Sequence, residues 1–143
     1  MKRAVIIVLS ILVVAALGFV IWASLPAGPD AQALTELESG DGVDVYELPG
    51  VTVMMPAGYL PETGLIFYPG ARVDYHSYAP LMRTISRAGY FTAVVKMPLN
   101  MAIFSSNRAG DIIYSYPQVK TWVLAGHSLG GAMAAQFAGQ NPD

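Results

Sequence analysis

Residues 123–131, with the sequence VLAGHSLGG, decide the fold of this chain. An apolar run leads into the pattern Gly-x-Ser-x-Gly at 126–130, and a stretch rich in glycine and alanine follows. This order predicts a strand, a sharp turn at Ser128, and a helix. So sharp a turn puts the serine in a sparsely populated backbone region and crowds its neighbours, so that glycine is needed at Gly126 and Gly130.

The predicted turn indicates nucleophilic chemistry at Ser128. It would project the hydroxyl from the end of a sheet, where the oxygen can attack an acyl carbonyl. The helix that begins after the serine offers free N–H groups and a positive dipole end to the anion that develops. We expect the N–H of Leu129 to be the first oxyanion donor, and the N–H of Ala71, after the strand expected at 65–68, to be the second.

Two other interpretations of the glycine pattern are weighed against this one. A tight strand-to-helix turn without chemistry would need the same small residues. A dinucleotide-binding loop is excluded, because the spacing G-x-G-x-x-G does not occur here.

Upstream of the turn, strand and helix patterns alternate after a hairpin. Strands are expected at 43–48, 51–55, 65–68, 91–96 and 121–125, and helices at 78–87, 107–114 and 129–138, with a short helix at 31–38. Ser77 is the expected N-cap of the helix at 78–87. Alternation of this kind predicts an α/β fold, a mostly parallel sheet with helices on both faces and the hairpin at one edge.

Residues 4–25 are almost wholly apolar, carry no charge and are long enough to cross a bilayer. Lys2 and Arg3 precede them, so the remainder is expected on the extracytoplasmic side of a single-pass membrane protein. A cleaved signal peptide is the alternative, but the run exceeds the usual hydrophobic region and Trp22 suits an interfacial position. We therefore expect a signal anchor at 1–25, a polar linker at 26–42 and the front part of a catalytic domain at 43–143.

Charge and composition exclude several classes of protein. The net charge is −2 and no basic stripe occurs, which argues against nucleic-acid binding. Cysteine is absent, so neither a disulfide framework nor a thiolate metal site is expected. We expect no cofactor and no metal. The expected partners are a small-molecule acyl or ester substrate and, through the N-terminal helix, a membrane.

Residues 126–132, GHSLGGA, resemble the corresponding turn of many lipases, esterases and related α/β-hydrolases. The wider chain resembles the bacterial alpha/beta hydrolase fold-5 family, which is related to dienelactone-hydrolase-like enzymes. The matching pieces are GLIFYPG at 64–70, YAPL at 78–81, AGY at 88–90, KMPLN at 96–100, MAA at 133–135 and NP at 141–142. The resemblance implies an α/β-hydrolase fold and a Ser–Asp–His hydrolase, and it implies no particular substrate.

The residues after Ser128 depart from the family pattern. In this fold the acid and then the histidine follow the serine along the chain, but only Asp143 and no histidine follow here. His127 is expected to pack or hydrogen-bond structurally, His76 to lie at the surface or to cap a helix, and Asp111 not to be the triad acid. A chain without its base would be inactive. The strand at 121–125 would also leave an apolar edge open, and we interpret the chain as a truncated part of a hydrolase.

Three further residues are candidates for the surroundings of the site. Tyr68 ends one expected strand and Met97 follows another, both at the carboxyl edge of the sheet. Either residue could line a pocket there, and core packing explains them equally well. Arg72 follows the second donor and is expected to be a solvated loop cation or to meet an anionic substrate.

Two other functions stay open beside hydrolysis. Some acyl-carrier transacylases also carry Gly-His-Ser-Leu-Gly, so acyl transfer is the second. A catalytically inactive, membrane-anchored fragment or pseudoenzyme is the third.

Overall fold

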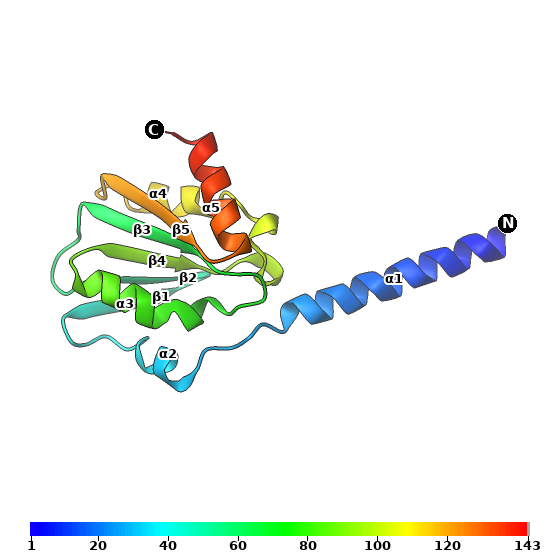
Figure 1. The fold of residues 1–143 in the computed structure, drawn as a ribbon, viewed down its shortest axis with the longest axis horizontal. Coiled ribbons are helices and arrows are strands. Elements are labelled where there is room, and N and C mark those ends of the chain that lie inside the picture. The colour runs from blue at the N-terminus through cyan, green and yellow to red at the C-terminus, as the bar shows by residue number, and fades with distance from the viewer. Residues whose placement is uncertain (143) are drawn as a thin grey trace.

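The structure is a computed structural model, and it describes residues 1–142. A long helix stands away from an α/β body (Figure 1). The elements in chain order are α1 (Lys2–Ser24), α2 (Ala31–Thr35), β1 (Val43–Leu48), β2 (Val51–Pro56), β3 (Thr63–Tyr68), η1 (Tyr75–Tyr78), α3 (Ala79–Arg87), β4 (Phe91–Val95), η2 (Pro98–Asn100), η3 (Ala102–Phe104), α4 (Arg108–Ser115), β5 (Thr121–Gly126) and α5 (Leu129–Gln140).

The five strands form one mixed sheet in the order β1-β2-β4-β3-β5. The hairpin of β1 and β2 lies at one edge, as the sequence predicts, and β2 runs antiparallel to β4. β3 runs parallel to both β4 and β5, and it pairs with β5 from Thr63↔Thr121 to Tyr68↔Gly126. The carboxyl ends of β3 and β5 therefore meet side by side, which brings the loop after Tyr68 next to Ser128.

Helices cover both faces of the sheet. Successive residues of a strand point to opposite faces, so a strand that is apolar throughout needs cover on both. Phe67 of β3 and Val94 of β4 pack with Ala79 and Met82 of α3 on one face. Ile66 and Tyr68 face the other side, in a cluster that includes residues of α4 and α5. These two layers confirm the predicted α/β class.

The α1 helix is apolar and almost wholly exposed. It has 23 residues, and its most apolar window has a mean hydropathy of 3.2 with no residue buried. Ala23, near its last turn, is its one buried residue. By length and composition it could cross a membrane, as expected.

The start of α3 differs from the expectation. Ser77 does not cap a helix; the Asp74 side chain accepts from the His76 N–H and begins the 3-10 turn η1, and α3 follows at Ala79. Pro80 in the first turn of α3 lacks an N–H and needs no cap. Ser77 was therefore the wrong residue, because it lies within the 3-10 turn and Tyr78 occupies the N-cap position of α3.

The helix expected at 31–38 ends at Thr35. Arg83 is only 3% exposed; its guanidinium donates to the carbonyls of Glu36, Glu38 and Gly40 and pairs with the Glu36 carboxylate at 2.6 Å. Arg83 lies 43–47 residues later in the chain, so these bonds fix the segment after α2 to a distant helix. The segment 36–40 is thus packed onto α3.

In the described part of the chain, β5 has a neighbour on one side only, β3. The Val123 side chain on this strand is 47% exposed. An apolar strand in this position has unpaired backbone groups along its outer side.

Candidate active site

Ser128 lies between the end of β5 and the start of α5. Its backbone has φ 51° and ψ −122°, a region that non-glycine residues rarely occupy. Two amides after it, those of Gly130 and Gly131, both donate to the carbonyl of His127 at 2.9 and 3.4 Å. The side chain of Ser128 is exposed. We call residues 126–131 the serine turn.

The glycines of the serine turn are required by contacts with backbone. A Cβ on Gly126 would stand 2.6 Å from the carbonyl carbon of Gly130, so the two ends of the turn touch each other. A Cβ on Gly130 would overlap the carbonyl oxygens of Tyr68 and Pro69 at the end of β3. Gly126 thus closes the turn on itself, whereas Gly130 lets the helix approach the neighbouring strand.

Two backbone N–H groups, one on each of the adjoining loops, are free of protein acceptors in the described structure. Within residues 1–142, neither the N–H of Leu129 nor that of Ala71 donates to a protein acceptor, whereas the N–H of Gly70 donates to the Tyr78 hydroxyl at 3.0 Å. Leu129 is the first residue of α5, and the N–H groups of the first turn of a helix have no acceptor within the helix. Ala71 is therefore the free amide of its loop.

Tyr78 joins the two loops, a role that no local pattern in the sequence predicts. Its hydroxyl accepts from the Gly70 N–H at 3.0 Å and forms a hydrogen bond with Nδ1 of His127, also at 3.0 Å. Burial raises the pKa of Tyr78, and the hydrogen bond from Gly70 opposes the rise. The tyrosine therefore stays protonated and holds the loop of Ala71 against the serine turn.

The same contact explains Gly70 and His127. A Cβ on Gly70 would lie 2.6 Å from Nδ1 of His127, so only glycine lets this ring sit against the loop. His127 makes a structural hydrogen bond, as the sequence predicts.

Tyr68 and Met97 are both buried. Tyr68 is 0% exposed, and its hydroxyl donates to the Ser106 carbonyl and accepts from the Ala109 N–H, both at 2.7 Å. Burial raises the pKa of this hydroxyl. Met97 is 3% exposed and belongs to the same core cluster. Tyr68 thus fixes the start of α4 to the end of β3.

The remaining candidates bond to groups outside the serine turn. Nε2 of His76 lies 3.0 Å from the Glu47 carboxylate, and Nδ1 lies 2.9 Å from that of Asp74. Asp111 pairs with Arg108 at 3.0 Å and is exposed. The Arg72 guanidinium donates to carbonyls at the end of α1, 47–50 residues earlier in the chain.

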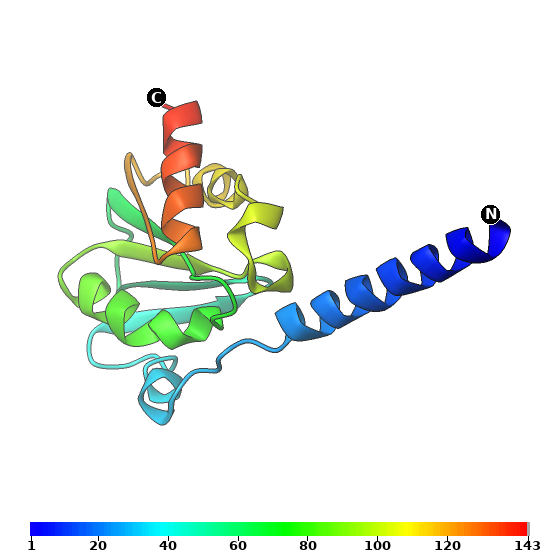
Figure 2. The ribbon, with the colours of Figure 1, turned by 45° about the vertical axis from the view of Figure 1, so that its right-hand side comes forward.

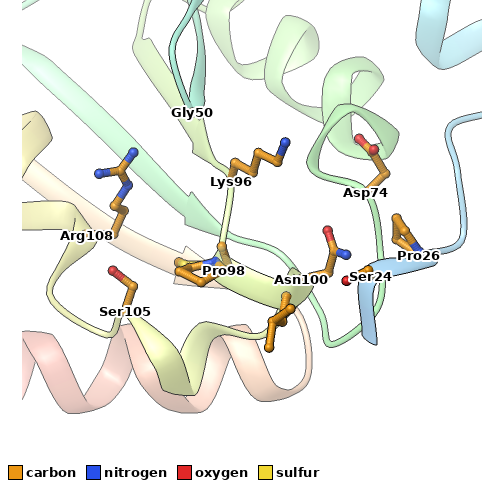
Figure 3. Close-up of a pocket in the computed structure, with 11 residues that line it drawn as sticks. Ser24, Pro26, Gly50, Asp74, Lys96, Pro98, Asn100, Ser105 and Arg108 are labelled. Carbon is orange, nitrogen blue, oxygen red and sulfur yellow. The ribbon is translucent and has the colours of Figure 1, made fainter. Parts of the chain in front are cut away.

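A cavity of about 620 Å³ opens beside the body but does not include the serine turn (Figure 3). Its lining comes from the end of α1, the loop after β4 and the start of α4, and comprises Ser24, Pro26, Gly50, Asp74, Lys96, Met97, Pro98, Leu99, Asn100, Ser105 and Arg108. Met97 therefore borders this cavity from the core side. In the described residues no group of three or more acidic or histidine side chains could hold a metal.

Comparison with known proteins gives one family and a set of similar folds. A model described as alpha/beta hydrolase family matches residues 64–143. A thermostable esterase from Pseudomonas putida is similar in structure, with a TM-score of 0.55, 19% identity, and coverage of 78% of this chain and 44% of that chain. An esterase from Pyrobaculum calidifontis has a TM-score of 0.56, 17% identity, and coverage of 88% and 46%.

An epoxide hydrolase from an endophytic Streptomyces is also similar, with a TM-score of 0.52, 17% identity, and coverage of 73% of this chain and 35% of that chain. At such identities the likeness concerns the fold alone. This chain spans less than half the length of each of these solved chains. No curated protein gives a significant match to the sequence.

Proposed function

Because this chain belongs to the alpha/beta hydrolase family, we propose that it forms part of a serine hydrolase that cleaves esters or other acyl compounds, with Ser128 as the nucleophile. One observation carries the proposal: an exposed serine is held at φ 51° between a strand and a helix. The N–H groups of Leu129 and Ala71, which have no protein acceptor in the described part of the chain, support the proposal as free donors. Backbone strain of this kind concentrates at functional sites.

The roles of the residues follow from this arrangement. The Ser128 oxygen attacks the acyl carbon, and the N–H groups of Leu129 and Ala71 stabilise the oxyanion. Removal of one such donor typically slows acyl transfer by about 100- to 1,000-fold. The Tyr78–His127 hydrogen bond at 3.0 Å positions the loop that carries Ala71.

The acid and base belong to the proposal as well. In this fold they follow the nucleophile along the chain, so we assign neither role to His76, His127 or Asp111, and we place both groups outside residues 1–143. A serine without its base is a weak nucleophile. Residues 1–143 alone should therefore give no burst with an activated ester.

We also propose the arrangement at the membrane. Residues 1–25 form a signal anchor, 26–42 connect it to the body, and 43–143 contribute to the hydrolase domain. Lys2 and Arg3 keep the N-terminus cytoplasmic, which places the body on the extracytoplasmic side.

The test is labelling with a fluorophosphonate. It uses the full-length protein, by which we mean residues 1–143 together with the proposed acid and base. We expect stoichiometric labelling that Ser128→Ala abolishes and that Ser115→Ala, at another exposed serine, leaves unchanged. Labelling of Ser128→Ala to the same extent would sink the assignment. Absence of labelling in the unaltered protein would favour an inactive membrane-anchored protein.

Hydrolysis and acyl transfer share the acyl-enzyme intermediate and would both give labelling. Product analysis with and without a thiol acceptor separates them. We expect free acid as the product in both conditions; an acyl thioester as the main product would indicate an acyltransferase.

A further inference from the structure

The end of α1 is fixed to the body by two side chains. The Arg72 guanidinium donates to the carbonyls of Trp22 at 3.1 Å and Leu25 at 2.8 Å, and it lies 4.3 Å from the centre of the Trp22 ring. The Asn100 amide donates to the Ala23 carbonyl at 2.8 Å. The last carbonyls of a helix have no partners within it, so these donors cap α1.

The chain that follows α1 is fixed to the same loop. The N–H of Ala27 donates to the Arg72 carbonyl at 2.7 Å, and the N–H of Asp74 donates to the Ala27 carbonyl at 2.9 Å. The N–H of Arg72 in turn donates to the Asn100 carbonyl at 2.8 Å. We call these contacts, between residues 22–27 and residues 72, 74 and 100, the anchor junction.

The anchor junction sets the direction of the sheet relative to α1. Arg72 follows Ala71 directly, so the helix ends beside one of the two proposed oxyanion donors. Figures 1 and 2 show that α1 projects from the side at which β3, β4 and β5 end, and that the loops of η2 and η3 and the start of α5 lie on this side too. If α1 spans a bilayer, this carboxyl edge of the sheet faces it.

The loop between β4 and α4, on this same side, carries apolar and cationic side chains. Ile103 and Phe104 of η3 are 50% and 48% exposed, and Leu25 after α1 is 63% exposed. Lys96 lines the cavity of about 620 Å³, which Ser24 at the end of α1 also lines, whereas Arg108 lies at the other end of this cavity and pairs with Asp111 (Figure 3). Exposed apolar side chains beside cations are typical of surfaces that contact the interface of an anionic bilayer.

We propose that the carboxyl edge of the sheet lies against the bilayer that α1 spans, and that Ser128 takes its substrate from this interface. The substrate class is then a long-chain, amphiphilic acyl ester, whose chain stays in the lipid while its ester group reaches the serine. The choice of substrate rests on the proposed function, whereas the orientation rests only on α1 as a span and on the anchor junction.

The absence of cysteine from residues 1–143 makes the orientation measurable. Phe104→Cys places a thiol on the proposed membrane side, and Lys120→Cys places one before β5, at the opposite end of the strand. Each variant of the full-length protein has one of these cysteines as its single reactive thiol, and a fluorophore is attached to it. The labelled protein is placed in vesicles of phosphatidylcholine and phosphatidylglycerol whose headgroups carry spin labels, which quench the fluorophore. We expect several-fold stronger quenching at position 104 than at position 120.

One double variant then tests the junction. With Arg72→Ala and Asn100→Ala together, quenching at position 104 should fall toward that at position 120. The ratio of turnover of a vesicle-embedded long-chain ester to that of a soluble short-chain ester should fall several-fold. A ratio cancels any general loss of activity.

The outcomes separate this inference from the proposed function. Equal quenching at the two positions, with Ser128 still labelled by a fluorophosphonate, would overturn the membrane-facing edge and leave the hydrolase. One-sided quenching without labelling of Ser128 would support the orientation and overturn the hydrolase together with its substrate.

Discussion

The serine turn and the anchor junction lie on either side of one loop, yet they are built from different kinds of contact. In the serine turn, Gly126 touches Gly130 and the amides of Gly130 and Gly131 bond to His127, all within a few residues. In the anchor junction, Arg72 and Asn100 reach carbonyls that lie 47–77 residues away. The first kind can be recognised in a short stretch of sequence, and the second only in the folded chain.

The difference also predicts how each region responds to substitution. Backbone packed against backbone cannot move aside, so a single added methyl group is costly. Where a side chain at or near the surface bonds to a carbonyl, a water molecule can take over the hydrogen bond when the side chain is removed. Four substitutions test this contrast, from the largest expected effect to the smallest.

Gly130→Ala should have the largest effect. Its Cβ would overlap the carbonyl oxygens of Tyr68 and Pro69, so β3 and α5 must separate. We expect a loss of about 3 kcal/mol or more in the free energy of unfolding, measured by urea denaturation in detergent.

The matched control for Gly130→Ala is Gly139→Ala in the same helix, where an added Cβ meets no atom within 4 Å. There alanine should stabilise the helix by about 0.5–1 kcal/mol. Equal effects at the two positions would mean that α5 does not pack on β3 as described.

Tyr78→Phe should have the second largest effect, because it removes the one acceptor of the Gly70 N–H and the partner of His127. The expected loss is about 1–2 kcal/mol in the free energy of unfolding. Amide exchange at Gly70 should become faster.

Tyr114→Phe serves as the control for Tyr78→Phe, since Tyr114 is 88% exposed and should tolerate the change. If Gly70 exchanges at the same rate in Tyr78→Phe as in the unaltered protein, the hydroxyl does not hold this loop.

Ser128→Gly should stabilise the protein. Glycine adopts φ 51° and ψ −122° without steric cost. The strain energy relieved in the folded protein should exceed the entropic cost of ordering glycine, so the free energy of unfolding should rise by about 1 kcal/mol. Ser128→Ala keeps the Cβ and should show no such gain. A midpoint of denaturation for Ser128→Gly at or below that of Ser128→Ala would argue against strain at this position.

Arg72→Lys should have the smallest effect on global stability, below about 1 kcal/mol. Lysine keeps the charge, but it lacks the planar fork that serves two carbonyls and stacks on Trp22. The sensitive measurement is limited proteolysis between residues 25 and 30, which should become faster.

Arg87→Lys is the control for Arg72→Lys, since Arg87 pairs with the exposed carboxylate of Asp41. Its proteolysis should match that of the unaltered protein. Faster cleavage in both variants would show that general loosening, and not the anchor junction, controls access to this segment.

Much of the fold could be predicted from the sequence for a definite reason. The strands 43–48 and 51–56, the alternation that follows and the turn at Ser128 all depend on residues close together in the chain. The helix at Ala31 shows where this reasoning stops. Local sequence favoured residues 31–38, but the helix ends at Thr35, and Arg83 donates to the carbonyls of Glu36 and Glu38 in the segment that follows.

The sequence by itself determined the α/β class, the apolar helix and the glycine pattern that lets Ser128 occupy a strained turn. Only the tertiary structure decided that β4 lies between β2 and β3, that Tyr78 joins Gly70 to His127, and that Arg72 caps α1. The physical reason is range. Backbone preferences and steric fit within a turn act over a few residues, whereas these hydrogen bonds join groups that meet only after the sheet has assembled.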